Sequence, residues 1–153
     1  MSQKIETGNQ VPEFSLPDQN GNIFNSTTLH GIKHVIFFYP KDESPGCTKE
    51  ACSFRDAYQD FQQAGAEVVG ISSDEVRAHQ SFISNHNLPY TLLSDTDKKV
   101  RKQFGVPGSL FGLIPGRVTY IIDSKGIVQH IFNSQLNTEG HIKKAIEIVG
   151  QID

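Results

Sequence analysis

The sequence is poor in several features that mark specialised proteins. Only two of its 153 residues are cysteines, and its Lys and Arg residues are scattered rather than gathered into a basic run. With a net charge of −3, the chain lacks the electrostatic footprint of a protein that binds nucleic acid or anionic membranes. Its longest apolar stretch, residues 35–39, is far too short to cross a bilayer. It also lacks repeats, low-complexity segments and linkers, so we expect a single domain over residues 1–153.

The first residues indicate where the protein works. Residues 1–6 are polar, with neither an apolar segment for secretion nor an Arg/Ser-rich transit region. We therefore expect a cytoplasmic protein, or one from the plastid stroma if a transit peptide has been removed. In a chain that is not secreted, two cysteines are more often catalytic or metal-binding than a structural staple.

Short apolar runs alternate with helical patterns along the chain. This alternation predicts an α/β domain with a central sheet. Residues 13–24 read as a hairpin with Asn20-Gly21 at its turn. We expect strands at 34–39, 67–72, 90–93, 117–122 and 127–132, and helices at 48–64 and 138–149. A capping box at 72–75 should open a further helix that runs to about residue 86. Asp95 or Thr96 should cap a short helix.

Residues 105–116 differ from the rest of the chain. Glycines and prolines there frame four apolar side chains, and apolar loop residues of this kind are unfavourable to expose. We expect them to cover something, either as a lid or as a wall beside an organic substrate tail. The four residues are Leu110, Phe111, Leu113 and Ile114.

Cys47 is the strongest candidate for a reactive residue. A buried-looking strand ends at Pro40, a polar loop follows, and Pro45-Gly46 breaks the chain just before the thiol. The helical pattern then begins, which places Cys47 in a first helical turn where backbone N–H groups lack partners and the dipole is positive. A thiol there loses its proton more easily, and the thiolate is the reactive form.

Two other residues favour a functional site over simple packing. Ser44 precedes Cys47 by three positions, so its hydroxyl could face the same small cavity. Arg117 begins a strand, and its guanidinium could favour the thiolate and donate hydrogen bonds to an oxygen-rich substrate. Taken alone, Ser44 is a loop hydroxyl and Arg117 a surface strand residue. His30 and His34 are four apart but straddle a loop and a strand, so we expect no metal site.

The spacing of Cys47 and Cys52 constrains any chemistry between them. On a continuous helix, five residues rise about 7.5 Å and turn through about 500°, so the two side chains point to different sides. A disulfide needs Cα atoms no more than about 6.8 Å apart. Either the first turns of the helix unwind on oxidation, or the two thiols never meet. We predict that they unwind, and that residues 48–55 are only marginally stable.

Taken together, these residues resemble the peroxiredoxins. The segment Pro40-Lys-Asp-Glu-Ser-Pro-Gly-Cys47 is similar to that family's Pro-x-x-x-Thr/Ser-x-x-Cys signature. The residues around it, 39–56, resemble the peroxiredoxin Q group, also called bacterioferritin comigratory protein. Three later segments fit that group in order and distance, and the match runs from about Val11 to Val149. They are Tyr90-Thr-Leu-Leu-Ser-Asp95, Gly105-Val-Pro-Gly108 and Pro115-Gly-Arg117.

The resemblance implies a fold and an activity. The fold would be thioredoxin-like, a central mixed sheet flanked by helices, with an N-terminal hairpin extension. The activity would be that of a monomeric thiol peroxidase that reduces hydrogen peroxide and organic hydroperoxides, takes electrons from thioredoxin and needs no metal, flavin or haem.

The resemblance also implies a role for each site residue. Cys47 would be the peroxidatic cysteine and Cys52 the resolving one, joined in an intramolecular disulfide. Pro40 would shield the site, Ser44 would hydrogen-bond the peroxide, and Arg117 would hold the thiolate and the peroxide oxygens. Ser44 departs from the commoner Thr and lacks the methyl group that restricts χ1, so rate or peroxide preference could shift.

Three other interpretations remain open from the residues alone. A thioredoxin-type disulfide oxidoreductase would use Cys-x-x-Cys, whereas four residues separate the cysteines here. A redox sensor could use the same opening of the helix to expose a binding surface for a partner. The third alternative is an α/β domain with two inert cysteines.

Overall fold

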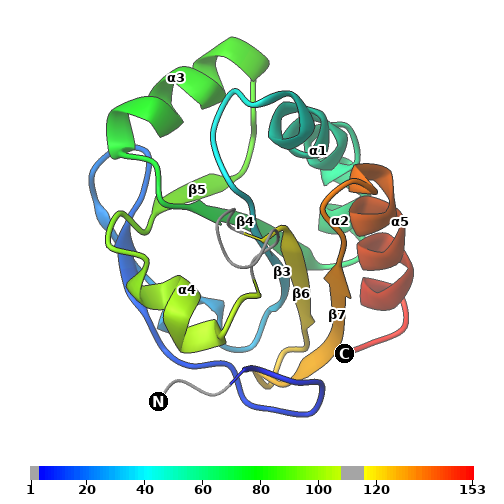
Figure 1. Cartoon of the computed structure of the whole chain (residues 1–153). Coiled ribbons are helices and arrows are strands. Elements are labelled where there is room, and N and C mark those ends of the chain that lie inside the picture. Colours follow the sequence, from blue (N-terminus) through cyan, green and yellow to red (C-terminus); the bar gives the residue numbers. More distant parts are fainter. Residues whose placement is uncertain (1–3, 108–115) are drawn as a thin grey trace.

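A five-stranded mixed sheet forms the centre of the molecule (Figure 1). The computed structural model describes residues 4–107 and 116–153. The strand order is β5–β4–β3–β6–β7; β3, β4 and β5 run parallel, and β6 and β7 are antiparallel to their neighbours. The strands are β3 (Lys33–Phe38), β4 (Ala66–Ser72), β5 (Thr91–Ser94), β6 (Val118–Ile122) and β7 (Val128–Asn133).

The N-terminal extension is a hairpin, as the sequence predicted. Strands β1 (Ser15–Pro17) and β2 (Ile23–Asn25) pair antiparallel, and the 3-10 helix η1 (Ser26–Leu29) follows. The turn between them needs a left-handed residue, and Gly21 supplies it with φ +79°. The Asp18 carboxylate accepts from the backbone N–H groups of Asn20 and Asn22, so polar turn chemistry fixes the register.

Both faces of the sheet are buried, which explains why the sequence of its central strand β3 is continuously apolar. Val35 and Phe37 point into one core, which the helices α1 (Pro45–Asp56), α2 (Tyr58–Gln63), α3 (Val76–His86) and α5 (Thr138–Val149) cover. Ile36 and Phe38 point into a second core, which α4 (Lys99–Phe104) and the hairpin cover. Cys47 belongs to the first core.

Several sequence predictions of local structure need correction. The helix expected at 48–64 begins earlier, at Pro45, and is two helices broken at Ala57, whose φ of −96° and ψ of 0° are not helical. The expected capping box does not form, because the side chain of Glu75, the N-cap of α3, makes no capping bond. Ser72 instead bonds to Asp74.

Asp95 bonds to the start of α4 although it lies three residues before the N-cap position. Lys98, in a left-handed conformation, is the N-cap residue, and its side chain makes no capping bond. The Asp95 carboxylate nevertheless accepts from the N–H groups of Val100 and Arg101, in the first turn of the helix. The expectation that Asp95 or Thr96 would cap this helix is therefore wrong, because Lys98 occupies the cap position.

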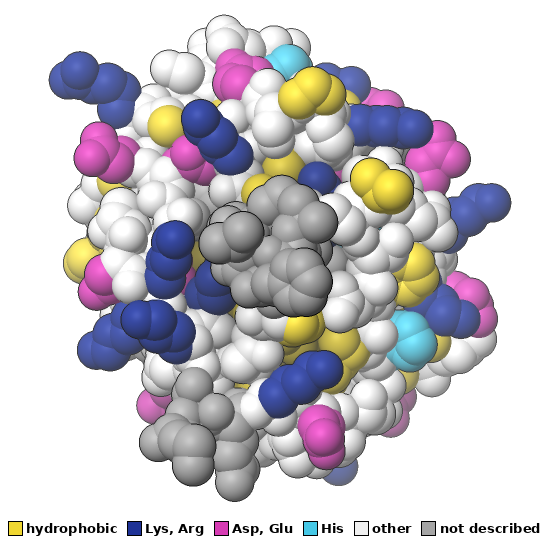
Figure 2. Space-filling model, in the orientation of Figure 1, with side chains coloured by type: hydrophobic (Ala, Val, Ile, Leu, Met, Phe, Trp, Pro, Cys, Tyr) yellow, Lys and Arg dark blue, Asp and Glu magenta, His cyan; other side chains and the backbone are white. Residues whose placement is uncertain are grey.

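The apolar side chains expected to act as a cover lie outside the described residues, since they fall within 108–115. Within the described residues, no helix has both the length and the apolar character needed to cross a membrane. The face in Figure 2 carries charged side chains of both signs, spread over its surface.

Candidate active site

The site begins where β3 ends. Tyr39, 1 % exposed, continues the strand direction, and residues 40–44 turn the chain into α1. Pro45 is the first residue of α1, where a missing N–H costs nothing. Cys47 is the third residue of α1 and is 1 % exposed. Its predicted place in a first helical turn is confirmed.

Pairing between β3 and β6 brings Arg117 to the same end of the sheet. Phe38 pairs with Val118 in antiparallel register, so Arg117, one residue earlier, lies beside the carboxyl end of β3. A Cβ atom built on Gly46 would lie 2.9 Å from Arg117 Nη2, so only a glycine lets the guanidinium pack this closely against the start of α1. Arg117 is 4 % exposed and lies beside the thiol, as the sequence suggested.

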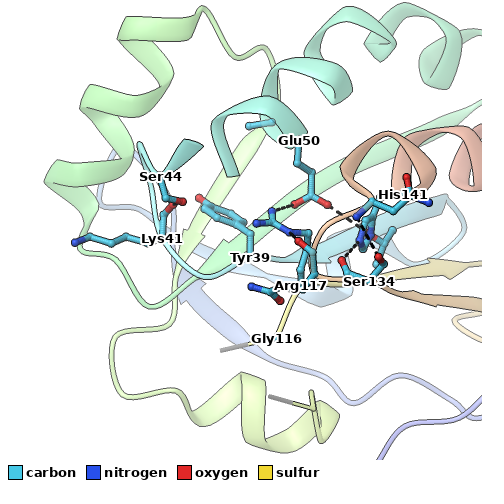
Figure 3. Close-up of polar contacts among 12 residues, drawn as sticks. Tyr39, Lys41, Ser44, Glu50, Gly116, Arg117, Ser134 and His141 are labelled. Carbon is cyan, nitrogen blue, oxygen red and sulfur yellow. Dashed lines mark hydrogen bonds and ion pairs between the residues drawn. The ribbon is translucent and has the colours of Figure 1, made fainter. Parts of the chain in front are cut away.

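Two acceptors fix the guanidinium in place (Figure 3). Nη1 donates to Glu50 Oε1 at 2.9 Å, and Nε donates to the carbonyl of Gln135 at 3.0 Å. Burial lowers the pKa of Arg117, but the charges of Glu50 and Cys47 outweigh it and raise that pKa overall. Because guanidinium already ionises far above neutral pH, Arg117 is a permanent cation within a buried site.

Glu50 is an unusual residue for this position, since it is fully buried. Burial raises the pKa of its carboxyl to about 7, although the charge of Arg117 and its hydrogen bond oppose the shift. Oε1 accepts from Arg117, whereas Oε2 has no hydrogen-bond partner among the described residues. Near neutral pH the carboxyl group therefore changes between its charged and neutral forms.

His141 lies in the first turns of α5, and its Nδ1 is 3.5 Å from Glu50 Oε2. Its Nε2 lies 2.7 Å from the carbonyl of Ser134, which can only accept, so Nε2 carries a proton. Burial lowers the pKa of His141 to about 4, so the ring is neutral at pH 7. Nδ1 then accepts from the Thr119 hydroxyl at 2.6 Å and gives Glu50 no proton.

Ser44 and Pro40 complete the loop that leads into α1. Ser44 is the N-cap residue of α1, and its carbonyl accepts from the N–H of Thr48. Its hydroxyl does not cap the helix but donates to the carbonyl of Lys41 at 2.7 Å. The proton is thus engaged, and the oxygen lone pairs are left as acceptors. Pro40 is half-buried directly after Tyr39.

Cys52 lies on the same unbroken helix as Cys47, and both thiols are free. The premise that an intact helix separates them is therefore confirmed. Two long-range bonds brace α1 near Cys52: the Tyr90 hydroxyl donates to the carbonyl of Ala51, and Arg55 Nη1 donates to the carbonyl of His86. Cys52 itself is half-buried.

Sequence reasoning missed Glu50 and His141. Glu50 follows Cys47 by three residues, so the two share one face of a helix, and that spacing was a usable signal. No comparable signal marks His141, because its approach to Glu50 depends on how α5 packs against α1.

The fold and the site together define a class of protein. A thioredoxin-like sheet carries a buried cysteine at the start of a helix, beside a fixed arginine, which is the architecture of a peroxiredoxin. The AhpC/TSA family model matches residues 7–131, and the chain belongs to that family.

Similar proteins narrow the assignment to the peroxiredoxin Q group. The chain is 51 % identical to the chloroplastic peroxiredoxin Q of Arabidopsis thaliana over 146 residues, 95 % of this chain and 68 % of that one. The crystal structure of peroxidoxin BcpB from Mycobacterium tuberculosis superposes with a TM-score of 0.89 at 39 % identity, covering 97 % and 99 % of the two chains.

A third similar structure concerns peroxide chemistry directly. A bacterioferritin comigratory protein from Xanthomonas campestris, solved to study its alkyl peroxide reduction activity, superposes with a TM-score of 0.82 at 26 % identity over 90 % of each chain. The chain is thus a thiol-dependent peroxidase, an oxidoreductase.

Proposed function

We propose that Cys47 is the peroxidatic cysteine and that Arg117 and Ser44 serve its reaction with a hydroperoxide. The observation that carries the proposal is the thiol's place in the first turn of α1, beside the buried Arg117 guanidinium. Backbone N–H groups and a permanent cation both stabilise a sulfur anion there. Hydrogen bonds to Glu50 and to the Gln135 carbonyl hold the guanidinium in a fixed position.

The first step oxidises the sulfur. The Cys47 thiolate attacks one peroxide oxygen in line with the O–O bond; an S–O bond forms as the O–O bond breaks. Negative charge develops on the departing oxygen, where Arg117 and the N–H groups at the start of α1 stabilise it. That oxygen takes up a proton and leaves as water or an alcohol, and the cysteine becomes a sulfenic acid. The Ser44 oxygen, with its own proton bonded to Lys41, accepts a hydrogen bond from the peroxide.

The second step needs movement of α1. With the helix intact, the two sulfurs cannot bond, so the turns around Cys52 must open first. The Cys52 thiolate then attacks the sulfenic sulfur and releases hydroxide, which becomes water on protonation. A dithiol protein such as thioredoxin reduces the disulfide through a mixed disulfide and is itself oxidised. Pro40, half-buried beside the thiol loop, shields the sulfur from solvent.

The substrates and setting follow from the relatives. The alkyl peroxide reduction reported for the Xanthomonas protein supports organic hydroperoxides as substrates in addition to hydrogen peroxide. The chloroplastic relatives support the plastid stroma, alongside the cytoplasm expected from the sequence. We propose a monomer, which sedimentation of the reduced and oxidised protein would test.

Mass spectrometry of peroxide-treated protein tests the chemistry. Without reductant, the wild type should lose two hydrogens as a disulfide joins Cys47 and Cys52. Cys52→Ser should instead carry an added oxygen on Cys47 and stop cycling with thioredoxin. Cys47→Ser should consume no peroxide, and substantial remaining turnover would refute the assignment. Repeated turnover with reductant distinguishes a peroxidase from a sensor, which would react once.

A further inference from the structure

A second buried polar cluster lies on the other side of the loop that precedes Cys47. Asp42 is 5 % exposed and His79, on α3, is completely buried. His79 Nδ1 lies 2.6 Å from Asp42 Oδ2, and His79 Nε2 lies 2.9 Å from the carbonyl of Leu93. The Tyr39 hydroxyl donates to the other oxygen of Asp42 at 2.5 Å. The proposed peroxide chemistry uses none of these groups.

Asp42 and His79 share a short hydrogen bond that is buried at both ends. His79 Nε2 faces the Leu93 carbonyl, which can only accept, so this nitrogen donates, and Nδ1 bonds to Asp42. Burial and the charge of Asp42 raise the pKa of the Tyr39 hydroxyl well above its ordinary value, so Tyr39 remains a donor. Each oxygen of Asp42 therefore accepts one short hydrogen bond from a buried donor.

Stability alone is a poor reason for such a pair. The cost of burying polar groups offsets much of what their hydrogen bonds contribute, and well-packed apolar residues often stabilise a core equally well. What the pair does provide is a fixed position for Asp42. The Asp42 carboxyl group bonds to Tyr39 and His79, and His79 is itself held by the Leu93 carbonyl. The backbone N–H of Asp42 adds a further tie by donating to Asp74 Oδ2 at 2.8 Å.

The loop fixed in this way carries the peroxide site. Asp42 comes two residues before Ser44 and five before Cys47. Between them, Glu43 takes a left-handed conformation with φ +64°, which is unfavourable for a side chain other than glycine. Glu43 also bonds to Asn85 and His86 at the end of α3, but that contact is exposed and correspondingly weak. The buried pair is the stronger of the two ties between the loop and α3.

We propose that Asp42 and His79 are positioning residues for the peroxide step. Resting on the proposed function of Cys47, they act through the loop: the pair sets the path of residues 42–44, and this path sets where the Ser44 oxygen and the start of α1 lie. Neither residue touches the substrate. A misplacement of about 1 Å at a reacting group can slow a reaction on the order of 10²-fold, so the loop needs a rigid support.

Variants of Asp42 separate positioning from simple stability. In Asp42→Asn the amide oxygen can accept from Tyr39 and the amide nitrogen can donate to His79 Nδ1, so both hydrogen bonds can be kept. Asp42→Ala removes both acceptors. His34→Gln is the matched control, because His34 is also a buried histidine, and among the described residues its side chain bonds only to the carbonyl of Ile32, at the far end of β3.

The measurement is the second-order rate constant for the first oxidation of Cys47 by hydrogen peroxide, in a stopped-flow instrument, beside the melting temperature of each variant. Asp42→Ala should react on the order of 10²-fold more slowly, and Asp42→Asn should recover most of the wild-type rate. His34→Gln should melt earlier and react at the wild-type rate.

Each outcome decides the proposal. A folded Asp42→Ala variant with the wild-type rate, or rates that simply follow melting temperature across all variants, would overturn it. If Asp42→Ala does not fold, Tyr39→Phe and His79→Gln carry the test: slower oxidation supports the proposal, and the wild-type rate in both rejects it. If the wild type itself does not react through Cys47, the proposed function fails, and that result is distinct from a failure of the positioning role.

Discussion

Arg117 and Glu50 are joined by a hydrogen bond of 2.9 Å between Nη1 and Oε1, and both side chains are buried. A contact this well shielded from water depends little on the salt concentration. The cation beside Cys47 is therefore already oriented before a peroxide arrives. Such preorganised charge is the commonest large contribution to enzyme catalysis.

Replacement of Arg117 tests this contribution directly. Arg117→Ala should slow the first oxidation of Cys47 by on the order of 10²-fold or more, as the loss of one transition-state donor usually does. The rate is measured by stopped flow at several peroxide concentrations. Arg77→Ala is the control, since Arg77 is exposed on α3. An unchanged rate in Arg117→Ala would remove this residue from the mechanism.

The sequence predicted most of the fold because its patterns are local. The run of apolar residues in β3 and the helical spacing of 138–149 required no knowledge of tertiary contacts, and the structure places a strand and a helix there. The break at Ala57 was missed because residues 48–64 have a continuous helical pattern. The capping box was wrong because the Ser72 hydroxyl bonds to Asp74, and Asp74 is in turn held by the N–H of Asp42, a partner 32 residues away.

The residues of the candidate site also divide into those that local sequence patterns predict and those that depend on tertiary contacts. Cys47 and Ser44 could be placed from the turn residues beside them, which act over a few positions. Arg117 could be suggested from its place before a strand, but its contact with Glu50 depends on the register of β3 and β6. The approach of His141 to Glu50 depends on the packing of α5 against α1, which no local pattern encodes.

Gly46 tests how closely the guanidinium must approach α1. In Gly46→Ala the new methyl group would lie 2.9 Å from Arg117 Nη2, so the guanidinium must shift. We expect the peroxide step to slow by about tenfold or more, through misplacement of the cation. Helix stability should hold or rise, because alanine is favoured over glycine in a helix by up to about 1 kcal/mol.

Gly150→Ala is the matched control for this variant. Its new methyl group meets no heavy atom closer than 3.5 Å, so it adds an alanine without crowding. Its peroxide rate should equal that of the wild type. Equal rates for both variants would show that the close packing of Gly46 and Arg117 does not matter.

Tyr90 tests the opening of α1 that the proposed disulfide between Cys47 and Cys52 would require. Its hydroxyl donates to the carbonyl of Ala51 at 2.6 Å, next to Cys52. Tyr90→Phe removes this bond, worth about 1 kcal/mol, so opening should become easier and the disulfide should form several-fold faster after oxidation. Rapid quenching followed by mass spectrometry measures that rate, and hydrogen exchange of residues 48–55 should increase.

Tyr58→Phe makes a suitable comparison for the tyrosine variant. The Tyr58 hydroxyl donates to Glu67 rather than to α1, so its loss should leave the disulfide rate unchanged. A Tyr90→Phe protein that exchanges its α1 amides faster but forms the disulfide no sooner would mean that helix opening does not limit resolution.

Glu50 and His141 should give opposing dependences of stability on pH. Burial raises the pKa of Glu50 from 4.5 to about 7, so the folded state holds a proton that the unfolded state has lost, and stability falls as pH rises from 4.5 to 7. Burial lowers the pKa of His141 from 6.5 to about 4, so stability rises as pH increases from 4 to 6.5. Each shift corresponds to on the order of 3 kcal/mol.

The opposing effects of Glu50 and His141 nearly cancel in the pH dependence of wild-type stability, and single variants should reveal each of them. Relative to the wild type, Glu50→Gln should gain stability as pH rises from 4.5 to 7, because the destabilising carboxyl is gone. His141→Gln should lose stability relative to the wild type as pH rises from 4 to 6.5. Urea unfolding at a series of pH values measures both differences in stability. If the two differences changed with pH in the same direction, Glu50 would not be held protonated and His141 neutral by burial.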